Sequence, residues 1–251
     1  MGITLATSIT DDNEYTIEYQ TNVSANDYLL KQYDNRTIDL TKYIIAATAE
    51  YTAPGSHNIT IPPWCSSIAC ILIGGGGGGS GGTIGISGRG GGAGGALASS
   101  AISVTASSYT LTVGAGGSKG LSGTKGSDGG NTTITIDTID DITITFTANG
   151  GKGGERGNAN SGSGGSTTTT SITCFVNGSN SSGTTGGGRA ALNSDEPKYC
   201  NTFTATGGNG YQNTGILGDG AGGGAGSATA LSGTTNGANG TDGYAKIYFY
   251  L

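Results

Sequence analysis

Runs of glycine constrain this chain more than any other feature of its sequence. Glycine supplies 52 of the 251 residues, about three times its average share. Nearly half of it lies in blocks, which are Gly74–Gly79, Gly90–Gly95, Gly114–Gly117, Gly150–Gly154, Gly186–Gly188 and Gly222–Gly224. The chain has only four prolines and no strict three-residue period along its length. A collagen triple helix is therefore excluded.

The blocks admit two structural interpretations. Glycine loses more conformational entropy on ordering than any other residue, so a long ordered block needs an arrangement that only glycine allows. One such arrangement is the polyglycine II helix, the counterpart of polyproline II with three residues per turn. Neighbouring helices without Cβ atoms can approach closely and bond amide to carbonyl. Flexible glycine-rich loops are the alternative, and both remain open at this point.

Between the blocks lie nine short runs rich in Ile, Val, Thr and aromatic residues. They are His57–Ile61, Ser66–Ile73, Ala101–Val104, Tyr109–Val113, Asn131–Ile136, Ile142–Ala148, Ser171–Val176, Thr202–Thr206 and Gly243–Tyr250. Residues of this kind favour strands, and glycine blocks break them. The sequence predicts an all-β fold, an antiparallel sandwich or jelly roll with glycine-rich loops.

Individual runs predict where each strand lies in its sheet. Ser66–Ile73 is apolar on both faces, which is typical of a central strand. In Asp141–Thr147, apolar residues alternate with threonines, as expected for a sheet with one solvated face. Tyr244, Tyr248 and Tyr250 share one face of the last run, and we expect them to pack in the core or across strands.

The composition changes near residues 48–55. Residues 1–47 contain almost no glycine, so we expect an N-terminal arm over 1–47 and a glycine-rich β-domain over 48–251. Ser24 and Asp27 resemble a capping box and predict a short helix over about 25–34. The arm is too small for a core of its own, so we expect it to pack on a partner or a neighbouring copy. A plain N-terminal extension is the alternative.

Charge and hydropathy exclude several partners. The net charge is −6, and the eleven Lys and Arg residues are scattered singly, so we expect no nucleic-acid partner. No run approaches the roughly twenty apolar residues of a membrane span, so we expect no membrane insertion. The first residues lack a basic region followed by an apolar core, and we expect no export by a signal peptide of this chain's own.

The cysteines are Cys65, Cys70, Cys174 and Cys200. They could form two disulfides or remain as free buried thiols. With a single histidine in the chain, they lack the paired spacing of a zinc site. We therefore expect no metal ligand and no cofactor.

Two patterns formally suggest catalysis. Residues 78–82 match a nucleophile elbow, but no strand-to-helix context follows and the only histidine is His57. Asp137, Asp140 and Asp141 lie between two predicted strands, where a solvated hairpin turn is favoured over a calcium site or a catalytic carboxylate pair. We expect no catalytic residues.

Two tyrosines in the glycine-rich part, Tyr199 and Tyr211, are the candidate recognition residues. Tyrosine provides a large contact area at a low cost in side-chain entropy, which suits a binding surface.

The order of strands and blocks resembles a known family. Tyr51–Gly82 reads YTAPGSHNITIPPWCSSIACILIGGGGGGSGG, and Tyr109–Gly117 (YTLTVGAGG), Gly129–Ile136 (GGNTTITI), Ile144–Gly154 (ITFTANGGKGG) and Gly237–Tyr250 (GANGTDGYAKIYFY) follow. Together they resemble the glycine-rich domain of phage tail-fibre and receptor-binding proteins and of giant-virus structural proteins. Two features depart from that pattern: Ile73 replaces a frequently aromatic residue, and Thr167–Thr170 with Cys174 and Cys200 look like an insertion.

The resemblance implies a non-enzymatic virion structural protein, either a minor capsid, spike or fibre component on the outer surface. The arm would dock on other virion proteins or on copies of this chain, and the β-domain would serve assembly or attachment to a host glycan or protein. A lectin-like adhesin of a cell surface is the alternative. A carbohydrate-active enzyme that uses Asp140 or Asp141 is the remote one.

Overall fold

The computed structural model describes residues 15–18, 29–32, 45–138, 142–155, 163, 172–178, 180, 191–192, 203–204 and 235–251. The chain divides into two units, Met1–Ile44 and Ile45–Leu251. In the first unit, β1 (Tyr15–Glu18) pairs antiparallel with β2 (Leu29–Gln32). The helix predicted over 25–34 is wrong, because pairing with β1 takes the backbone hydrogen bonds that a helix would have used.

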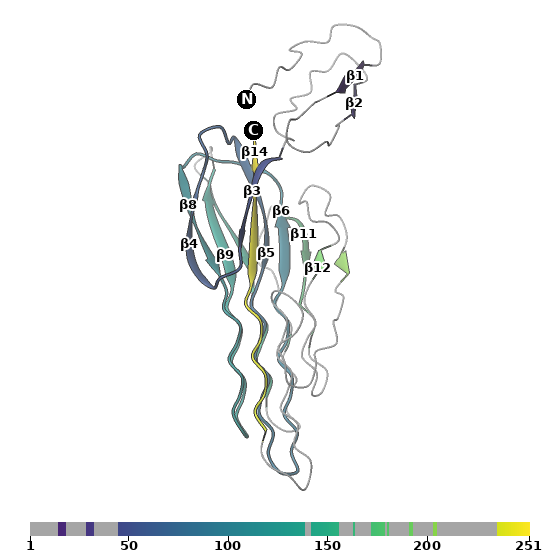
Figure 1. Ribbon diagram of the computed structural model, residues 1–251, viewed down its shortest axis with the longest axis vertical. Helices are drawn as coiled ribbons and strands as arrows, with labels where there is room; N and C mark the ends of the chain where they lie inside the picture. The colour runs from purple at the N-terminus through teal and green to yellow at the C-terminus, as the bar shows by residue number, and fades with distance from the viewer. Residues whose placement is uncertain are drawn as a thin grey trace. The chain divides into compact units, whose positions relative to one another are not determined.

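Two antiparallel sheets form the second unit (Figure 1). The four-stranded sheet has the order β10-β9-β8-β4, with bounds Thr143–Ala148, Thr132–Asp137, Ser108–Val113 and Gly55–Thr60. The six-stranded sheet has the order β11-β6-β5-β14-β3, with bounds Ile172–Val176, Ala96–Ser99, Ser67–Ile73, Tyr244–Tyr250 and Ile45–Tyr51. Its sixth strand, β7 (Ile102–Ser103), also pairs with β5. A separate pair joins β12 (Ala191–Leu192) and β13 (Phe203–Thr204). The described residues contain no helix, and the predicted all-β sandwich is confirmed.

The core lies between the two sheets and follows the alternation of the sequence. Fully buried side chains from both sheets meet there, including Ile59, Ile68, Leu72, Leu111, Ile134, Phe146 and Ile247. A second apolar cluster covers the other face of the six-stranded sheet and contains Ala69, Ile71, Ala98, Tyr248 and Tyr250. Every residue of β5 is therefore buried, which confirms the expected central strand. Tyr248 and Tyr250 pack in this cluster rather than at a recognition surface.

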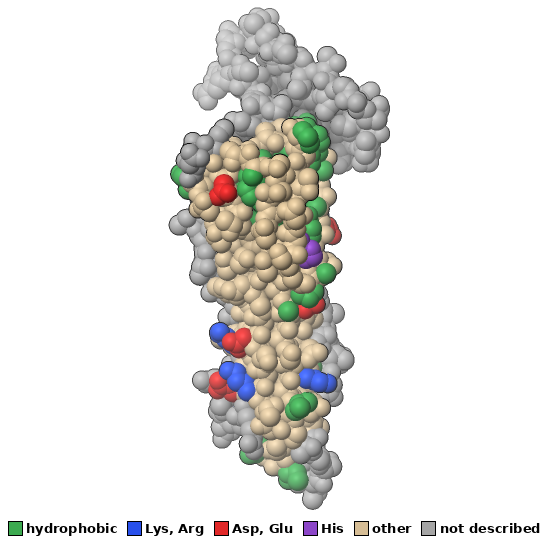
Figure 2. Space-filling model, turned by 90° about the vertical axis from the view of Figure 1, so that its left-hand side faces the viewer, with side chains coloured by type: hydrophobic (Ala, Val, Ile, Leu, Met, Phe, Trp, Pro, Cys, Tyr) green, Lys and Arg blue, Asp and Glu red, His purple; other side chains and the backbone are tan. Residues whose placement is uncertain are grey.

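The outer face of the four-stranded sheet is covered by hydroxyl groups. Exposed positions on it alternate with the core residues and are Ser56, Asn58, Thr60, Ser108, Thr110, Thr112, Thr135, Thr143 and Thr145. We call this surface the hydroxyl face. Figure 2 shows this side of the unit as a broad area with few charged or apolar side chains over the strands. Hydroxyls and amides, rather than ions, keep this face in contact with water.

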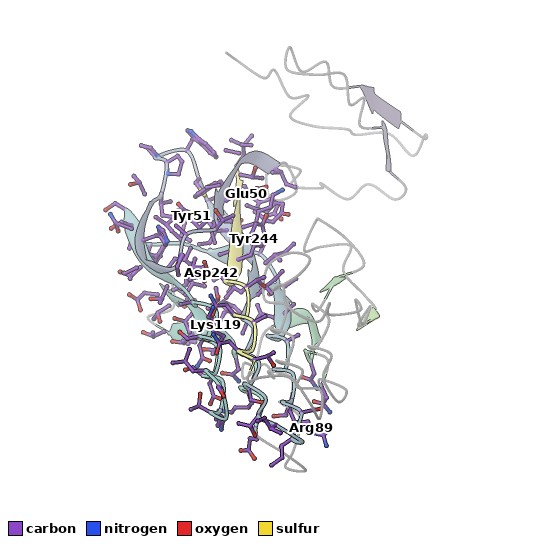
Figure 3. All side chains as sticks on the ribbon, turned by 60° about the horizontal axis from the view of Figure 1, so that its bottom comes forward. Glu50, Tyr51, Arg89, Lys119, Asp242 and Tyr244 are labelled. Atoms are coloured by element: carbon purple, nitrogen blue, oxygen red, sulfur yellow. The ribbon has the colours of Figure 1, made fainter. Side chains whose placement is uncertain are left out.

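Each of the nine predicted runs overlaps a strand, but β2, β3 and β12 lie outside these runs. Strand β6 was not predicted either. Its residues, ALAS, have low intrinsic β-propensity, and it is a strand because β5 and β11 pair on its two sides. Strand β3 pairs with β14 along its length, and the Lys246 ammonium lies 2.9 Å from the carboxylate of Glu50, which Figure 3 labels. Residues 45–47, placed in the arm from the sequence, thus lie in the six-stranded sheet.

All the described glycine segments leave the sandwich at one end. Strands β5, β8 and β10 run into glycine segments there, and β6, β9 and β14 begin after them. Thr132 is fully buried at this junction, where its hydroxyl donates to the Ile73 carbonyl (2.6 Å) and accepts from the Gly114 amide (3.0 Å). One hydroxyl therefore joins the two sheets at the end of the sandwich where the glycine segments begin. Ile45 and Tyr250 lie at the opposite end.

Replacing Phe146 with Ala tests the core. The side chain is fully buried between the sheets, so Phe146→Ala should lower the free energy of unfolding by about 3–5 kcal/mol. Thr110→Ala on the hydroxyl face is the control and should change it by less than about 0.5 kcal/mol. Denaturant unfolding followed by circular dichroism measures both. Equal effects of the two substitutions would contradict the assigned core.

Candidate functional site

Six described segments beyond the sandwich form one bundle, which we call the glycine bundle. They are residues 74–82, 89–95, 114–120, 124–130, 149–154 and 235–243, drawn as wavy rods in Figure 1. Three of them, 74–82, 114–120 and 149–154, continue from strands and run away from the sandwich. The other three return to it. These segments contain the glycine blocks that distinguish this sequence, so we treat the bundle and its far end as the candidate site.

Segment 74–82 is the centre of the glycine bundle. Its nine consecutive N–H groups all donate to carbonyls of other segments, at 2.8 to 3.0 Å, and the recipient changes with a period of three. The first set goes to segment 89–95, where Gly74, Gly77 and Ser80 donate to Gly95, Gly92 and Arg89. The second goes to segment 124–130, where Gly75, Gly78 and Gly81 donate to Gly130, Ser127 and Thr124. The third goes to segment 235–243, where Gly76, Gly79 and Gly82 donate to Thr241, Ala238 and Thr235. Three residues per turn is the repeat of polyglycine II. Ordered packing, rather than flexible loops, describes these blocks.

Carbonyls of the central segment are also used. The amides of Gly117 and Gly120 donate to Gly76 and Gly79, and those of Gly151 and Gly154 donate to Gly75 and Gly78. Five described segments therefore bond to segment 74–82. Several of these outer segments also bond to one another, as in the 2.9 Å bond from the Ser127 amide to the Ser118 carbonyl. The segments of the bundle therefore form one continuous hydrogen-bonded network rather than a set of independent loops.

Close approach of the segments explains why the chain uses glycine here. A Cβ at Gly78 would overlap the Ser118 carbonyl, and one at Gly77 would overlap the Lys152 carbonyl. The same conflict recurs at every third residue of the outer segments, for example at Gly237 and Gly240. The obstructing atoms are backbone, so they cannot rotate away as a flexible side chain could.

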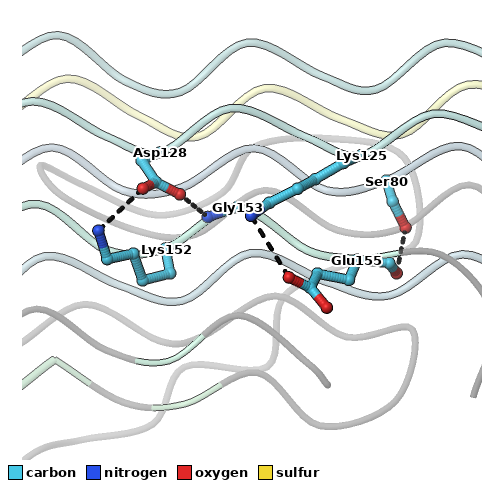
Figure 4. Close-up of polar contacts among 6 residues, drawn as sticks. All are labelled: Ser80, Lys125, Asp128, Lys152, Gly153 and Glu155. Carbon is cyan, nitrogen blue, oxygen red and sulfur yellow. Dashed lines mark hydrogen bonds and ion pairs between the residues drawn. The ribbon is translucent and has the colours of Figure 1, made fainter. Parts of the chain in front are cut away.

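Ser80 is the one non-glycine residue within the run 74–82. It is fully buried, and its hydroxyl donates to the Glu155 carbonyl at 2.8 Å (Figure 4). Its oxygen also accepts from the Arg89 amide at 2.7 Å. His57 lies in β4 instead, with its ring nitrogen 2.7 Å from the Ala53 carbonyl. The residues that formally match a nucleophile elbow thus hold bundle segments together.

A ladder of Asn and Asp side chains closes the outside of the bundle. Three side-chain oxygens, three residues apart on segment 235–243, accept from amides of residues 116–122 in the same chain: Asn236 from Ser122 (3.1 Å), Asn239 from Lys119 (2.8 Å) and Asp242 from Gly116 (2.7 Å). Asp128 and Asn131 do the same for Gly153 (2.8 Å) and Gly150 (3.0 Å). We call these five residues the Asx ladder. It supplies acceptors to outer amides that would otherwise bond only to water.

The sequence carried a signal for this ladder that our reasoning missed. Residues 237–243 read GANGTDG, a local three-residue period of glycine, with Asn or Asp at a fixed place before each following glycine. The period holds within single segments only, and a search for one along the whole chain does not reveal it.

Two ion pairs lie on the outside of the bundle. Lys152 lies 2.9 Å from the Asp128 carboxylate, and Lys125 lies 3.4 Å from Glu155 (Figure 4). All four side chains are substantially exposed, so each pair contributes little to stability. Desolvation raises the pKa of Asp128, but hydrogen bonds from the Lys152 ammonium and the Gly153 amide outweigh it and hold the pKa below its ordinary value.

Two ordered turns form the described part of the far end, and we call residues 83–88 and 121–124 the bundle tip. Thr83 and Ile86 exchange two backbone hydrogen bonds around Gly85, whose φ is +73°. The Thr124 amide donates to the Leu121 carbonyl around Gly123, whose φ is +70°. Both values favour glycine. Ile84 is 66% exposed and Leu121 is 60% exposed, so the tip presents aliphatic side chains to solvent.

The remaining predicted site residues fall into two groups. Tyr199, Tyr211 and Cys200 lie outside the described residues. Cys65 and Cys70 are free thiols. Complete burial raises the pKa of Cys70 to about 12, so this thiol is not a nucleophile at neutral pH. Cys174 belongs to β11, which pairs with β6.

The aspartate cluster is described only in part. Asp137 ends β9, and its carboxylate accepts from the Thr143 hydroxyl at 2.7 Å across the β9–β10 connection. Asp140 and Asp141 lie outside the described residues. Within the part of the chain that the structure describes, no three His, Cys, Asp or Glu residues gather in a way that could hold a metal ion. The same residues form no helix with the length and apolar character to cross a membrane.

A sandwich of two antiparallel sheets that continues into a bundle of polyglycine segments defines a glycine-rich β-domain. The chain belongs to the glycine-rich domain family, whose model matches residues 52–250. That range includes the strands from β4 to β14 and all six segments of the bundle. No curated protein matches the chain.

Replacing Gly78 with Ala tests the packing of the bundle. The added Cβ would overlap the Ser118 carbonyl, so Gly78→Ala should cost roughly 3 kcal/mol or more because backbone must move to admit it. Ser118→Ala, at an exposed position of the segment that Gly78 faces, should be close to neutral. Thermal unfolding of both variants measures the difference. A neutral Gly78→Ala would mean that the segments are not in contact.

Replacing Asn239 tests the Asx ladder. Only its oxygen is used, as acceptor for the Lys119 amide, so Asn239→Asp should keep the stability and Asn239→Ala should lower it by about 1 kcal/mol. Exchange of the Lys119 amide with deuterated solvent gives a local measurement, and it should accelerate only in the Ala variant. Acceleration in both variants would show that the oxygen is not the acceptor that matters.

Proposed function

We propose that this chain is a non-enzymatic structural protein of a virion, a minor capsid, spike or fibre component on the outer surface. Its N-terminal arm docks on other virion proteins or on copies of the same chain. The glycine bundle holds its tip away from the docking point, for assembly or for attachment to a host glycan or protein. Nucleic acid is not a partner, and the protein does not insert in a membrane.

The observation that carries this proposal is the hydrogen bonding of segment 74–82. All nine of its amides are bonded to surrounding segments, so the bundle is stiff despite its glycine content. A stiff element that ends in exposed aliphatic turns suits a spacer. Ile45, the first residue of β3, lies at the end of the sandwich opposite the bundle. We therefore assign attachment through the arm to that end and contact with a partner to the bundle tip.

Chemistry of the described side chains supports a non-enzymatic role. Ser80 is buried, its hydroxyl donates to the Glu155 carbonyl and accepts from the Arg89 amide, and Cys70 is buried with a raised pKa. The ion pairs Lys125–Glu155 and Lys152–Asp128 are exposed and paired along the bundle. None of these groups has the exposed, activated state that a nucleophile or general base needs.

The hydroxyl face favours a second candidate, a lectin-like adhesin of a cell surface. Uncharged hydroxyl and amide groups, such as those of Asn58, Thr110 and Thr112, can donate to and accept from the hydroxyls of a sugar. Among its described residues, this face has no exposed aromatic side chain on which a sugar ring could stack. We therefore rank the adhesin below the virion component.

Copurification is the decisive experiment for the virion role. The protein should remain with purified, salt-washed particles and appear at their outer surface by immunogold electron microscopy. A variant that lacks residues 1–44 should lose this association, whereas Thr110→Ala should keep it. Absence of the wild-type chain from washed particles would refute the virion role. Specific binding on a glycan array together with that absence would favour the adhesin.

A further inference from the structure

Large exposed apolar side chains occur only at the two ends of the unit Ile45–Leu251, within the part that the structure describes. They are Ile84, Ile86 and Leu121 at the bundle tip, and Trp64 and Ile142 at the other end. Trp64 follows β4, and Ile142 follows the turn after β9, so both lie where the sandwich ends away from the glycine bundle. We call Trp64, Asp137 and Ile142 the sandwich end.

The same two ends carry opposite charge. Arg89, Lys119 and Lys125 lie on the bundle towards its tip, where Glu155 and Asp128 are the acidic residues described near them (Figure 3 labels Arg89 and Lys119). This excess of basic groups occurs in a chain with a net charge of −6. The sandwich end has the exposed carboxylate of Asp137.

The flank between the ends offers no comparable anchor among the described residues. The hydroxyl face presents small polar side chains, and Figure 2 shows its surface largely free of apolar and charged groups over the strands. Stable protein contacts depend on a few buried aromatic or aliphatic anchors with complementary charge around them. On the described surface, such groups are found at the ends.

We propose that copies of this chain associate head to tail, with the bundle tip of one copy against the sandwich end of the next. Ile84, Ile86 and Leu121 would pack against Trp64 and Ile142 of the neighbour, and the bases near the tip would face Asp137. The inference rests on the proposed function, since it names a partner for the bundle tip. A second copy is favoured over an unrelated partner because the chain itself provides both complementary surfaces.

This contact joins two different surfaces, so it does not saturate in a symmetric dimer. Each copy that binds leaves one tip and one sandwich end free, and the product is an open-ended row. Three aliphatic side chains make a small contact, so each single junction is weak. The row therefore forms only at high concentrations of the chain.

Sedimentation velocity of the full chain over a range of concentrations tests the proposal. The wild type should show weight-average mass that rises with concentration without a plateau at the dimer. The double variant Ile84→Ser with Leu121→Ser removes two apolar anchors and should weaken association by about tenfold or more. Thr110→Glu on the hydroxyl face is the control and should leave association unchanged.

Exchanging the charges of Lys119 and Asp137 tests whether the bundle tip of one copy meets the sandwich end of another. Lys119→Glu and Asp137→Lys should each weaken self-association alone. A mixture of the two variants should recover part of it, because the acidic tip of the first variant then meets the basic sandwich end of the second.

Two results would overturn the proposal. One is a wild-type chain that stays monomeric at its highest soluble concentration, and the other is association that ignores both the tip and the end variants. If the protein copurifies with particles but stays monomeric, head-to-tail contact fails while the proposed function stands. If the chain self-associates but is absent from particles, the proposed function fails while head-to-tail contact stands.

Discussion

The amide-to-carbonyl hydrogen bond between segments that have no Cβ atom is the interaction on which this structure depends. In the sandwich, side chains keep the two sheets apart, at about 10 Å in sandwiches of this kind. In the bundle, Gly75 from beyond β5 bonds directly to Gly130 from before β9, so the two layers merge. Only glycine permits that approach, and the position of every segment around 74–82 follows from it.

The sandwich and the bundle depend on each other. Pairing of β5 with β6 and β14 brings the segments 74–82, 89–95 and 235–243 to one edge with the correct neighbours. Without this alignment, the entropy of ordering so many glycines would oppose the bundle. The bundle in turn fastens the two sheets at their common end, where the buried Thr132 hydroxyl bridges them. Strand pairing and glycine packing are two parts of one cooperative unit.

Much of this fold could be predicted from local patterns. The alternation of apolar residues with threonines in β10 and the two apolar faces of β5 placed those strands correctly. Each strand has apolar residues on the faces that the sheets bury, so its own sequence shows which faces are buried. Strand β6 was missed, since its small residues are strands only through their neighbours. The choice between loops and polyglycine II depended on contacts between distant segments, and no single block records these. The Asx ladder was missed although Asn236, Asn239 and Asp242 share one spacing.

Alternating direction in the bundle has a consequence for its length. Three described segments run outward and three return, and each outward segment is bonded to returning ones with a repeat of three residues. Inserting one or two residues in a segment would turn its remaining glycines away from their neighbours. Adding a triplet to every segment would keep all contacts and extend the bundle by roughly 9 Å. The reach of such a domain is thus quantised, and it can grow or shrink only in steps of one polyglycine turn.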